Sequence, residues 1–270
     1  MIGAALLASL MWGIADFLAG RASRLHPAAM VALVGQAMGL VALLAILLVR
    51  GADGDAIVPG VFVGLFGAVA VLAFYRALAV GTMSIVAPIV ATSAIVPVLA
   101  GVFDGERPGT LQWIGIAAAL TGVALASMEP GDGDAADSRK ALRLALVAAP
   151  GIGLSLVFLD RAAEHDALTG VASARAVGVP VLVLVALKAA ARVPWGAVPK
   201  LAVIGLLDTG ANAAFAIATT GGLLSVAAVL GGLFPIVTVA LAYLILHERL
   251  RPVQRAGVLL ALAGIPLISA

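Results

Sequence analysis

Three charged residues stand inside long apolar stretches of this sequence: Asp16, Arg175 and Asp208. A charge in nonpolar surroundings needs a partner, a wet cavity or a change of protonation state, because an isolated buried charge is costly. These residues are therefore the first candidates for ligand binding or proton transfer.

Arg175 and Asp208 are predicted to form one pair. They lie in the apolar runs 167–187 and 198–219, each about 12–16 Å from its helix end at 1.5 Å per residue, and consecutive helices run antiparallel. A guanidinium group suits a carboxylate. Two roles stay open: the pair fixes the packing of two helices, or it lines a cavity where Arg175 binds an anionic group. Asn212, one turn after Asp208, shares both interpretations.

Asp16 has no evident partner within its own helix. Apolar surroundings favour the protonated form of a carboxyl group, which makes Asp16 a candidate for proton exchange. The alternative is a surface role, in which the side chain reaches toward Arg21 or the lipid headgroups.

Four weaker candidates for the same cavity are Trp12, Gln36, Tyr75 and Ser93. Trp12 is either a cavity wall or part of the packed core. Tyr75, close to the end of its apolar run, is also typical of the aromatic belt at a membrane surface.

No enzyme motif accompanies these residues. The sequence has no cysteine, no HExxH, no GxSxG and no P-loop with its lysine. Glu106 and Glu248 each directly precede a helix and are predicted to be helix caps rather than an acid–base pair. Residues 160–166, which include His165, lack the converging ligands of a metal site and are predicted to form a loop. We expect neither an enzyme nor a cofactor or metal site.

Composition points to a lipid bilayer as the surroundings of this chain. Hydrophobic residues make up 63% of its 270 residues, charged residues only 11%, and the mean hydropathy is +1.18. Soluble domains carry about 25% charged residues. No basic patch with interleaved aromatic residues suggests nucleic acid as a partner. We expect a multi-pass protein of the inner or plasma membrane of the cell.

Ten apolar runs are long enough to cross about 30 Å of hydrocarbon as helices. They are 2–20, 28–49, 57–80, 84–103, 110–128, 141–159, 167–187, 198–219, 223–246 and 253–270. The alternation typical of membrane β-strands is missing. The predicted fold is an all-α integral membrane protein with ten transmembrane helices.

The two halves of the sequence resemble each other. Shifts of 140 to 142 residues pair Gly13 with Gly153, Arg21 with Arg161, Phe74 with Phe215, Gly81 with Gly222, Ser84 with Ser225, Glu106 with Glu248, Gln112 with Gln254, Gly115 with Gly257 and Gly122 with Gly264. With five helices in each half, the second half must be inverted relative to the first. Inverted repeats are the usual construction of secondary transporters, with the binding site near the midplane between them.

This repeat divides the chain into a first five-helix repeat, 1–128, a polar linker, 129–140, and a second five-helix repeat, 141–270. Gln36 then corresponds to Ala176, which is next to Arg175. Both repeats are therefore expected to offer polar groups to one cavity.

Several stretches resemble the drug/metabolite transporter superfamily in its ten-helix, EamA-type form. They are WGIADFLAGRAS (12–23), FYRALAVGTMSIVAPIVATSAIVPVLAG (74–101), GERPGTLQWIGIAAALTGVALAS (105–127) and HERLRPVQRAGVLLALAGIPLIS (247–269). The resemblance implies a secondary carrier, often an exporter, of amino acids, metabolites or drugs. Related small multidrug carriers also have an acidic residue in the first helix, which implies that Asp16 couples transport to protons.

We therefore expect a transporter that moves small molecules by alternating access, with export as the favoured direction. The alternative is a membrane enzyme or flippase that acts on a lipid or polyprenyl carrier. A closed cavity at mid-membrane favours the transporter, and a long lateral opening to lipid favours the alternative.

The distribution of basic residues predicts the orientation. The membrane side that holds both termini has three of them, Arg50, Arg107 and Arg161, whereas twelve lie on the side of the linker. The positive-inside rule therefore places the linker in the cytoplasm and both termini outside. The resemblance points the other way, since ten-helix members of that superfamily usually keep both termini in the cytoplasm.

Cysteine labelling tests this orientation, because the sequence has no cysteine of its own. One variant carries Gly133→Cys and another a cysteine added after Ala270. A membrane-impermeant thiol reagent on intact cells is expected to label only the added C-terminal cysteine, and both cysteines after lysis. Labelling of intact cells at position 133 alone would contradict the charge rule.

Overall fold

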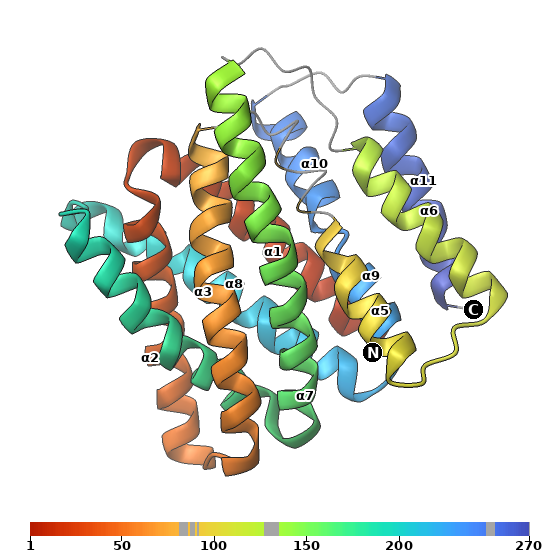
Figure 1. Ribbon diagram of the computed structural model, residues 1–270, viewed down its shortest axis with the longest axis horizontal. Helices are drawn as coiled ribbons and strands as arrows, with labels where there is room; N and C mark the ends of the chain where they lie inside the picture. The colour runs from red at the N-terminus through yellow and green to blue at the C-terminus, as the bar shows by residue number, and fades with distance from the viewer. Residues whose placement is uncertain (81–85, 87–89, 91, 127–134, 247–251, 270) are drawn as a thin grey trace.

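Helices make up all of the regular structure in the described residues, as the composition predicts. A computed structural model gives the fold and describes residues 1–80, 86, 90, 92–126, 135–246 and 252–269 (Figure 1). The α-helices are α1 (Ile2–Leu25), α2 (Ala28–Arg50), α3 (Ile57–Val80), α5 (Ile95–Phe103), α6 (Thr110–Ala126), α7 (Ala135–Lys188), α8 (Val198–Thr220), α9 (Leu224–Gly231), α10 (Phe234–Leu246) and α11 (Pro252–Ser269). Three 3-10 turns join them: η1 (Gly54–Ala56), η2 (Thr92–Ala94) and η3 (Trp195–Ala197).

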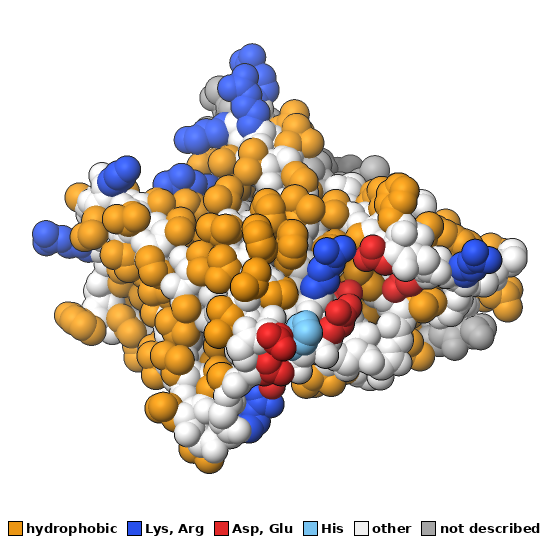
Figure 2. Space-filling view, turned by 60° about the horizontal axis from the view of Figure 1, so that its bottom comes forward, with side chains coloured by type: hydrophobic (Ala, Val, Ile, Leu, Met, Phe, Trp, Pro, Cys, Tyr) orange, Lys and Arg blue, Asp and Glu red, His pale blue; other side chains and the backbone are white. Residues whose placement is uncertain are grey.

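Five stretches of the described residues are long and apolar enough to cross a membrane. They are Ile2–Leu25, Ala28–Arg50, Gly54–Val80, Arg139–Lys188 and Trp195–Thr220, and shorter apolar helices accompany them. Figure 2 shows a broad apolar face with Lys and Arg side chains mostly toward its edges. Large apolar side chains on the surface of α2, such as Leu48 and Val49, are almost fully exposed. Such a surface is suited to lipid and poorly suited to water.

The predicted number of ten spans is not established by these helices. Residues 127–134, which include the first half of the predicted linker, lie outside the described residues. Helix α7 already begins at Ala135, so the end of the predicted linker is helical.

The prediction of a loop at 160–166 is wrong. Helix α7 continues through this segment and bends at Asp166, whose backbone is extended (φ −154°, ψ 111°). The Oδ1 atom of Asp166 accepts a hydrogen bond of 2.6 Å from the backbone N–H of Thr169, the geometry of a helix N-cap. The connection between the predicted spans 141–159 and 167–187 is thus a single capping residue rather than a loop.

Asp166 also connects the two halves of the chain. Its carboxylate accepts hydrogen bonds of 2.7 and 2.6 Å from Arg50 Nη2, at the end of α2. Partial burial raises the pKa of the Asp166 carboxyl, but hydrogen bonds from Thr169 and Arg50 outweigh burial and hold that pKa below its ordinary value. The stability that this carboxylate contributes is therefore present above its ordinary pKa and lost as the pH falls through the lowered value.

Close helix packing mainly joins the first half of the chain to the second. Helix α1 packs along α8, α3 along α7 and α6 along α11; Figure 1 shows the last pair side by side. Glycine permits this approach: a methyl group at Gly122 would overlap the backbone of Gly257 and Ala261. Likewise, a methyl group at Gly264 would press against the backbone of Gly115. Small residues are the usual means by which membrane helices approach closely.

The glycines that the sequence repeat aligns make reciprocal contacts. Gly13, in the first half, faces Phe234 of α10, in the second half. Its counterpart Gly153, in the second half, faces Ser93 of η2, in the first half. Each glycine thus packs onto the fourth predicted span of the opposite half. Such reciprocity is expected of two repeats related by a two-fold axis.

The predicted continuous span 223–246 is broken. Helices α9 and α10 are separated at Gly232 and Leu233. Pro235 has no N–H to donate to the carbonyl of Gly231. Glycine loses more conformational freedom in a helix than other residues do, so both residue types weaken a helix at this point. In the first half, the described part of span 84–103 changes from the 3-10 turn η2 to the α-helix α5.

Glu106 caps a helix, as predicted, but the helix is not the one that follows it. Its carboxylate accepts hydrogen bonds from the backbone N–H groups of Leu224 and, at 3.0 Å, of Ser225, at the start of α9. A carboxylate there pairs N–H groups that the helix leaves free and complements the helix dipole. The contact links the two halves a second time. Glu248, predicted to be a cap as well, lies outside the described residues.

Candidate functional site

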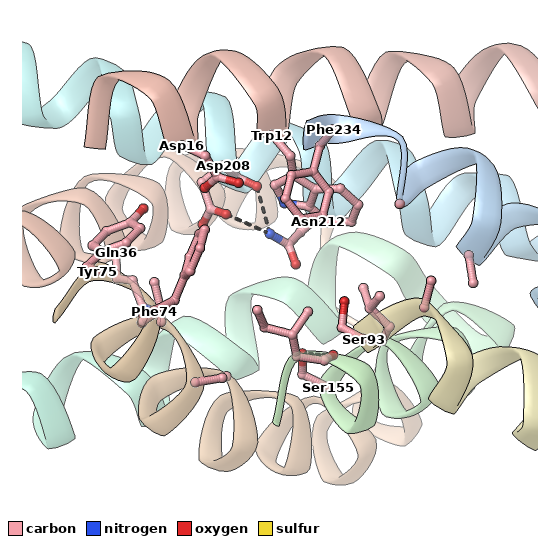
Figure 3. A pocket seen from close by; sticks show the side chains of 18 of the residues that line it. Trp12, Asp16, Gln36, Phe74, Tyr75, Ser93, Ser155, Asp208, Asn212 and Phe234 are labelled. Atoms are coloured by element: carbon pink, nitrogen blue, oxygen red, sulfur yellow. Dashed lines mark hydrogen bonds between the residues drawn. The ribbon is translucent and has the colours of Figure 1, made fainter. Parts of the chain in front are cut away.

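One pocket brings together every residue that the sequence analysis selected as a site candidate. These are Arg175 and seven residues that Figure 3 labels: Trp12, Asp16, Gln36, Tyr75, Ser93, Asp208 and Asn212. Its walls come from α1, α2, α3, η2, α7, α8, α9 and α10. The pocket has an empty volume of about 770 Å³, which includes the space at its mouth. Both halves of the chain therefore contribute to a single cavity.

The predicted contact between Arg175 and Asp208 is confirmed. Arg175 Nη2 donates a hydrogen bond of 2.6 Å to Asp208 Oδ2, and the two side chains are only 9% and 23% exposed. Asn212 Nδ2 donates to the Asp208 backbone carbonyl at 2.7 Å and to Asp208 Oδ1 at 3.4 Å. Both carboxylate oxygens of Asp208 thus have donors. The pair meets the requirement that a buried charge be paired and hydrogen-bonded.

Asp16 lies in the pocket wall and not at the protein surface. Figure 3 shows its carboxylate beside that of Asp208. Within the described residues, the Asp16 carboxylate receives no hydrogen bond. Arg21, the partner in the alternative interpretation, lies instead over the ring of Phe17, at 5.8 Å from the ring centroid. The structure therefore places a carboxylate without a protein partner against the cavity.

Aromatic side chains form an apolar wall of the pocket. The Trp12 ring lies 5.6 Å from that of Phe215 and 6.5 Å from that of Phe234, measured between centroids. Tyr75 is buried next to Phe74, with 5.9 Å between the ring centroids. Burial of Tyr75 argues against a place in an interfacial belt. The wall suits a flat apolar ligand surface.

Several pocket residues were not selected from the sequence. They include Phe74, Ser155, Phe234 and Gly67. The nearest atom to a methyl group added at Gly67 would be Ser155 Cβ, at 3.9 Å. Ser155 had a usable signal, a polar residue in the middle of an apolar run. Apolar residues such as Phe234 had none, because apolar residues occupy every face of a membrane helix.

A smaller pocket adjoins the main one. It has an empty volume of about 330 Å³ and shares Gln36, Gly67, Ser155, Arg175 and Asn212 with the main pocket. Asp16, Asp208 and Arg175 are the charged side chains among the described residues that line the two pockets. With both carboxylates ionised, the lining carries one more negative than positive charge.

A double-mutant cycle tests whether Arg175 and Asp208 act as one unit. Arg175→Ala or Asp208→Ala leaves one buried charge without its partner, and removing one member of a buried pair costs about 3–5 kcal/mol. Each single variant is expected to melt at a much lower temperature in detergent, and the double variant to recover part of the loss. Strictly additive losses would contradict a direct interaction.

Comparisons with known proteins agree with this architecture. The model of the EamA-like transporter family matches residues 1–128 and 139–270, once for each half of the chain. A search of curated proteins gave no match. A protein solved by crystallography superimposes with a TM-score of 0.74 over 98% of this chain and 94% of its own, at 20% sequence identity, which shows a common fold. Since the family model covers both halves, the chain belongs to the EamA-like transporter family.

Proposed function

We propose that the pocket between the two halves is the substrate site of a secondary transporter that works by alternating access. Membership of the family makes the chain a multi-pass membrane protein and a transporter of small molecules. The observation that carries the finer proposal is the composition of the pocket wall, to which both matched halves contribute charged or polar side chains. Sites between repeats, beside broken helices, are characteristic of secondary transporters. Gly232, at the break between α9 and α10, lines this pocket.

Ten helices, arranged as two inverted five-helix repeats in the inner or plasma membrane, are part of this proposal. The reciprocal glycine contacts of the two halves support it. Rocking of one repeat against the other would expose the pocket to each side in turn.

The substrates that suit the pocket are small amphipathic molecules, such as amino acids, other metabolites or drugs. The aromatic wall at Trp12 and Phe234 offers apolar contact, and Asp16 offers a carboxylate to a cationic or proton-donating group. We propose export as the direction. The lipid-carrier alternative has no comparable support, because the polar groups gather in a pocket lined by eight helical elements.

We further propose that Asp16 couples transport to protons. It is the pocket carboxylate that no described side chain pairs, whereas Asp208 is held by Arg175 and Asn212. Asp16 can therefore gain or lose a proton without breaking an existing ion pair. Its carboxylate can bind either a proton or a cationic substrate group, but not both at once. This competition would couple movement of the proton to movement of the substrate.

Transport by purified protein in proteoliposomes tests both parts of the proposal. Wild-type protein is expected to accumulate a substrate against its gradient when a pH gradient is imposed. Asp16→Asn, which keeps the shape of the side chain but cannot exchange a proton, is expected to abolish pH-driven accumulation while substrate still binds. Asp104→Asn, an exposed carboxylate outside the pocket, is the matched control and is expected to transport normally.

Two results would count against the proposal. Normal proton-driven rates in Asp16→Asn would remove this residue from coupling. Absence of any movement by wild-type protein that binds the compound would argue against transport of that compound.

A further inference from the structure

Three glycines of α3 lie on the side of that helix that packs along α7: Gly60, Gly64 and Gly67. A methyl group at Gly60 would come within 2.6 Å of the backbone carbonyl oxygen of Gly170. A methyl group at Gly64 would overlap the backbone carbonyl of Ala174. Gly60 and Gly64 are therefore required for the two helices to approach this closely.

Gly67 differs from these two glycines, because neither packing nor backbone conformation requires it. The nearest atom to a methyl group at this position would be Ser155 Cβ of α7, at 3.9 Å, which is an ordinary contact. The described glycines with a positive φ are Gly51 and Gly105, so the backbone at Gly67 suits residues that have a side chain. Glycine also weakens a helix relative to alanine. The distinctive property of Gly67 is therefore the space that its missing side chain leaves.

This space belongs to the pocket between the two halves. Gly67 and Ser155 line both the main pocket and the smaller one. The gap between the helices is local, because Phe66, the preceding residue, stacks on Phe158 of α7 with 5.7 Å between the ring centroids. Figure 3 shows Ser155 across the pocket from Trp12. The cavity therefore extends from the aromatic wall to the gap at Gly67.

The surroundings of this gap suit an apolar group. The Ser155 hydroxyl already donates a hydrogen bond of 2.7 Å to the backbone carbonyl of Ile152. Apolar side chains line the adjoining smaller pocket, namely those of Val63, Ala68 and Val171. Moving an apolar group from water into such a place is favourable.

We propose that Gly67 determines how bulky a substrate the site accepts, because the space beside it holds a second apolar group of the substrate. The first apolar group lies on the aromatic wall at Trp12. A positive charge faces Asp16, since the lining carries more negative than positive charge when both carboxylates are ionised. The class of substrate is then an amphipathic cation with two apolar groups rather than one. This inference rests on the proposed function, since it specifies the substrate of the same site.

Two amines test this size preference: benzylamine and 4-phenylbenzylamine, which adds a second ring to the same benzylammonium group. Their dissociation constants are measured from the shift in melting temperature of the purified, detergent-solubilised protein. Wild-type protein is expected to bind 4-phenylbenzylamine at least about tenfold more tightly, the gain typical of burying one more aromatic ring.

Two variants, Gly67→Ala and Gly67→Leu, fill the space in steps. The preference for the larger amine is expected to fall part of the way in Gly67→Ala and to disappear in Gly67→Leu. Gly3→Leu is the matched control, because Gly3 is a helical glycine of α1 that has open space around it and lines neither pocket. It is expected to keep the wild-type preference. Partition of the larger amine into detergent would affect all of these proteins equally.

Melting temperatures without ligand separate a pocket role of Gly67 from a packing role. Gly67→Ala is expected to melt at the wild-type temperature or slightly above it, because the methyl group enters open space and alanine favours a helix. Gly64→Ala is expected to melt well below the wild-type temperature, because its methyl group would overlap the backbone of Ala174.

The role of Gly67 would be overturned by wild-type protein that binds neither amine or binds both equally. It would also be overturned by an unchanged preference in both Gly67 variants, by loss of both amines in Gly67→Ala, or by a melting temperature of Gly67→Ala as low as that of Gly64→Ala. Failure of the proposed function has a different signature. The size preference and its loss in the Gly67 variants would then be seen in binding, but wild-type proteoliposomes would move neither amine across the membrane.

Discussion

The buried contact between Arg175 and Asp208 is the constraint on which the rest of the site depends. A charge at this depth is tolerated only with its partner, and the partner comes from the neighbouring helix α8. The contact therefore fixes how α7 and α8 face each other. It also occupies the guanidinium group and leaves the Asp16 carboxylate without a partner among the described residues. The division of roles between the two acidic residues follows from which of them Arg175 reaches.

Packing across the two halves places this ion pair at a cavity. Helices α1, α3 and α6 each lie along a helix of the second half, and glycines such as Gly13 and Gly153 make the approaches close. The helices of membrane proteins associate through such fitted surfaces, because lipid supplies little hydrophobic drive between them. The fit leaves space at Gly67, which has no side chain, and at Gly232, where the helix breaks between α9 and α10. The same interface thus supplies both the stability of the fold and the room for a ligand.

The sequence predicted the charged and polar part of this site well, for a physical reason. Asp16, Arg175 and Asp208 are costly in a membrane, so each must point inward, and a matching depth was enough to pair two of them. The apolar walls at Phe74 and Phe234 could not be predicted in this way, since an apolar residue is equally stable against lipid, helix or cavity.

The fold was predictable in outline and less so at its breaks. The all-helical class and the two similar halves follow from composition and from the glycine spacing. The bend of α7 at Asp166 was mistaken for a loop because its polar residues suggested one, whereas a single capping carboxylate is sufficient. The target of Glu106 was unpredictable, because α9 lies more than a hundred residues away and only tertiary packing brings them together.

The fluorescence emission of Trp12 tests most directly whether the pocket between the halves binds the substrate. The sequence has three tryptophans, and Trp113 and Trp195 are exposed, at 42% and 89%. A variant with Trp113→Phe and Trp195→Phe leaves Trp12 as the single tryptophan, in the pocket wall. For any compound that this variant transports, the account predicts a saturable change in emission with the same half-saturation as transport. A transported compound that leaves the emission unchanged at saturation would contradict it.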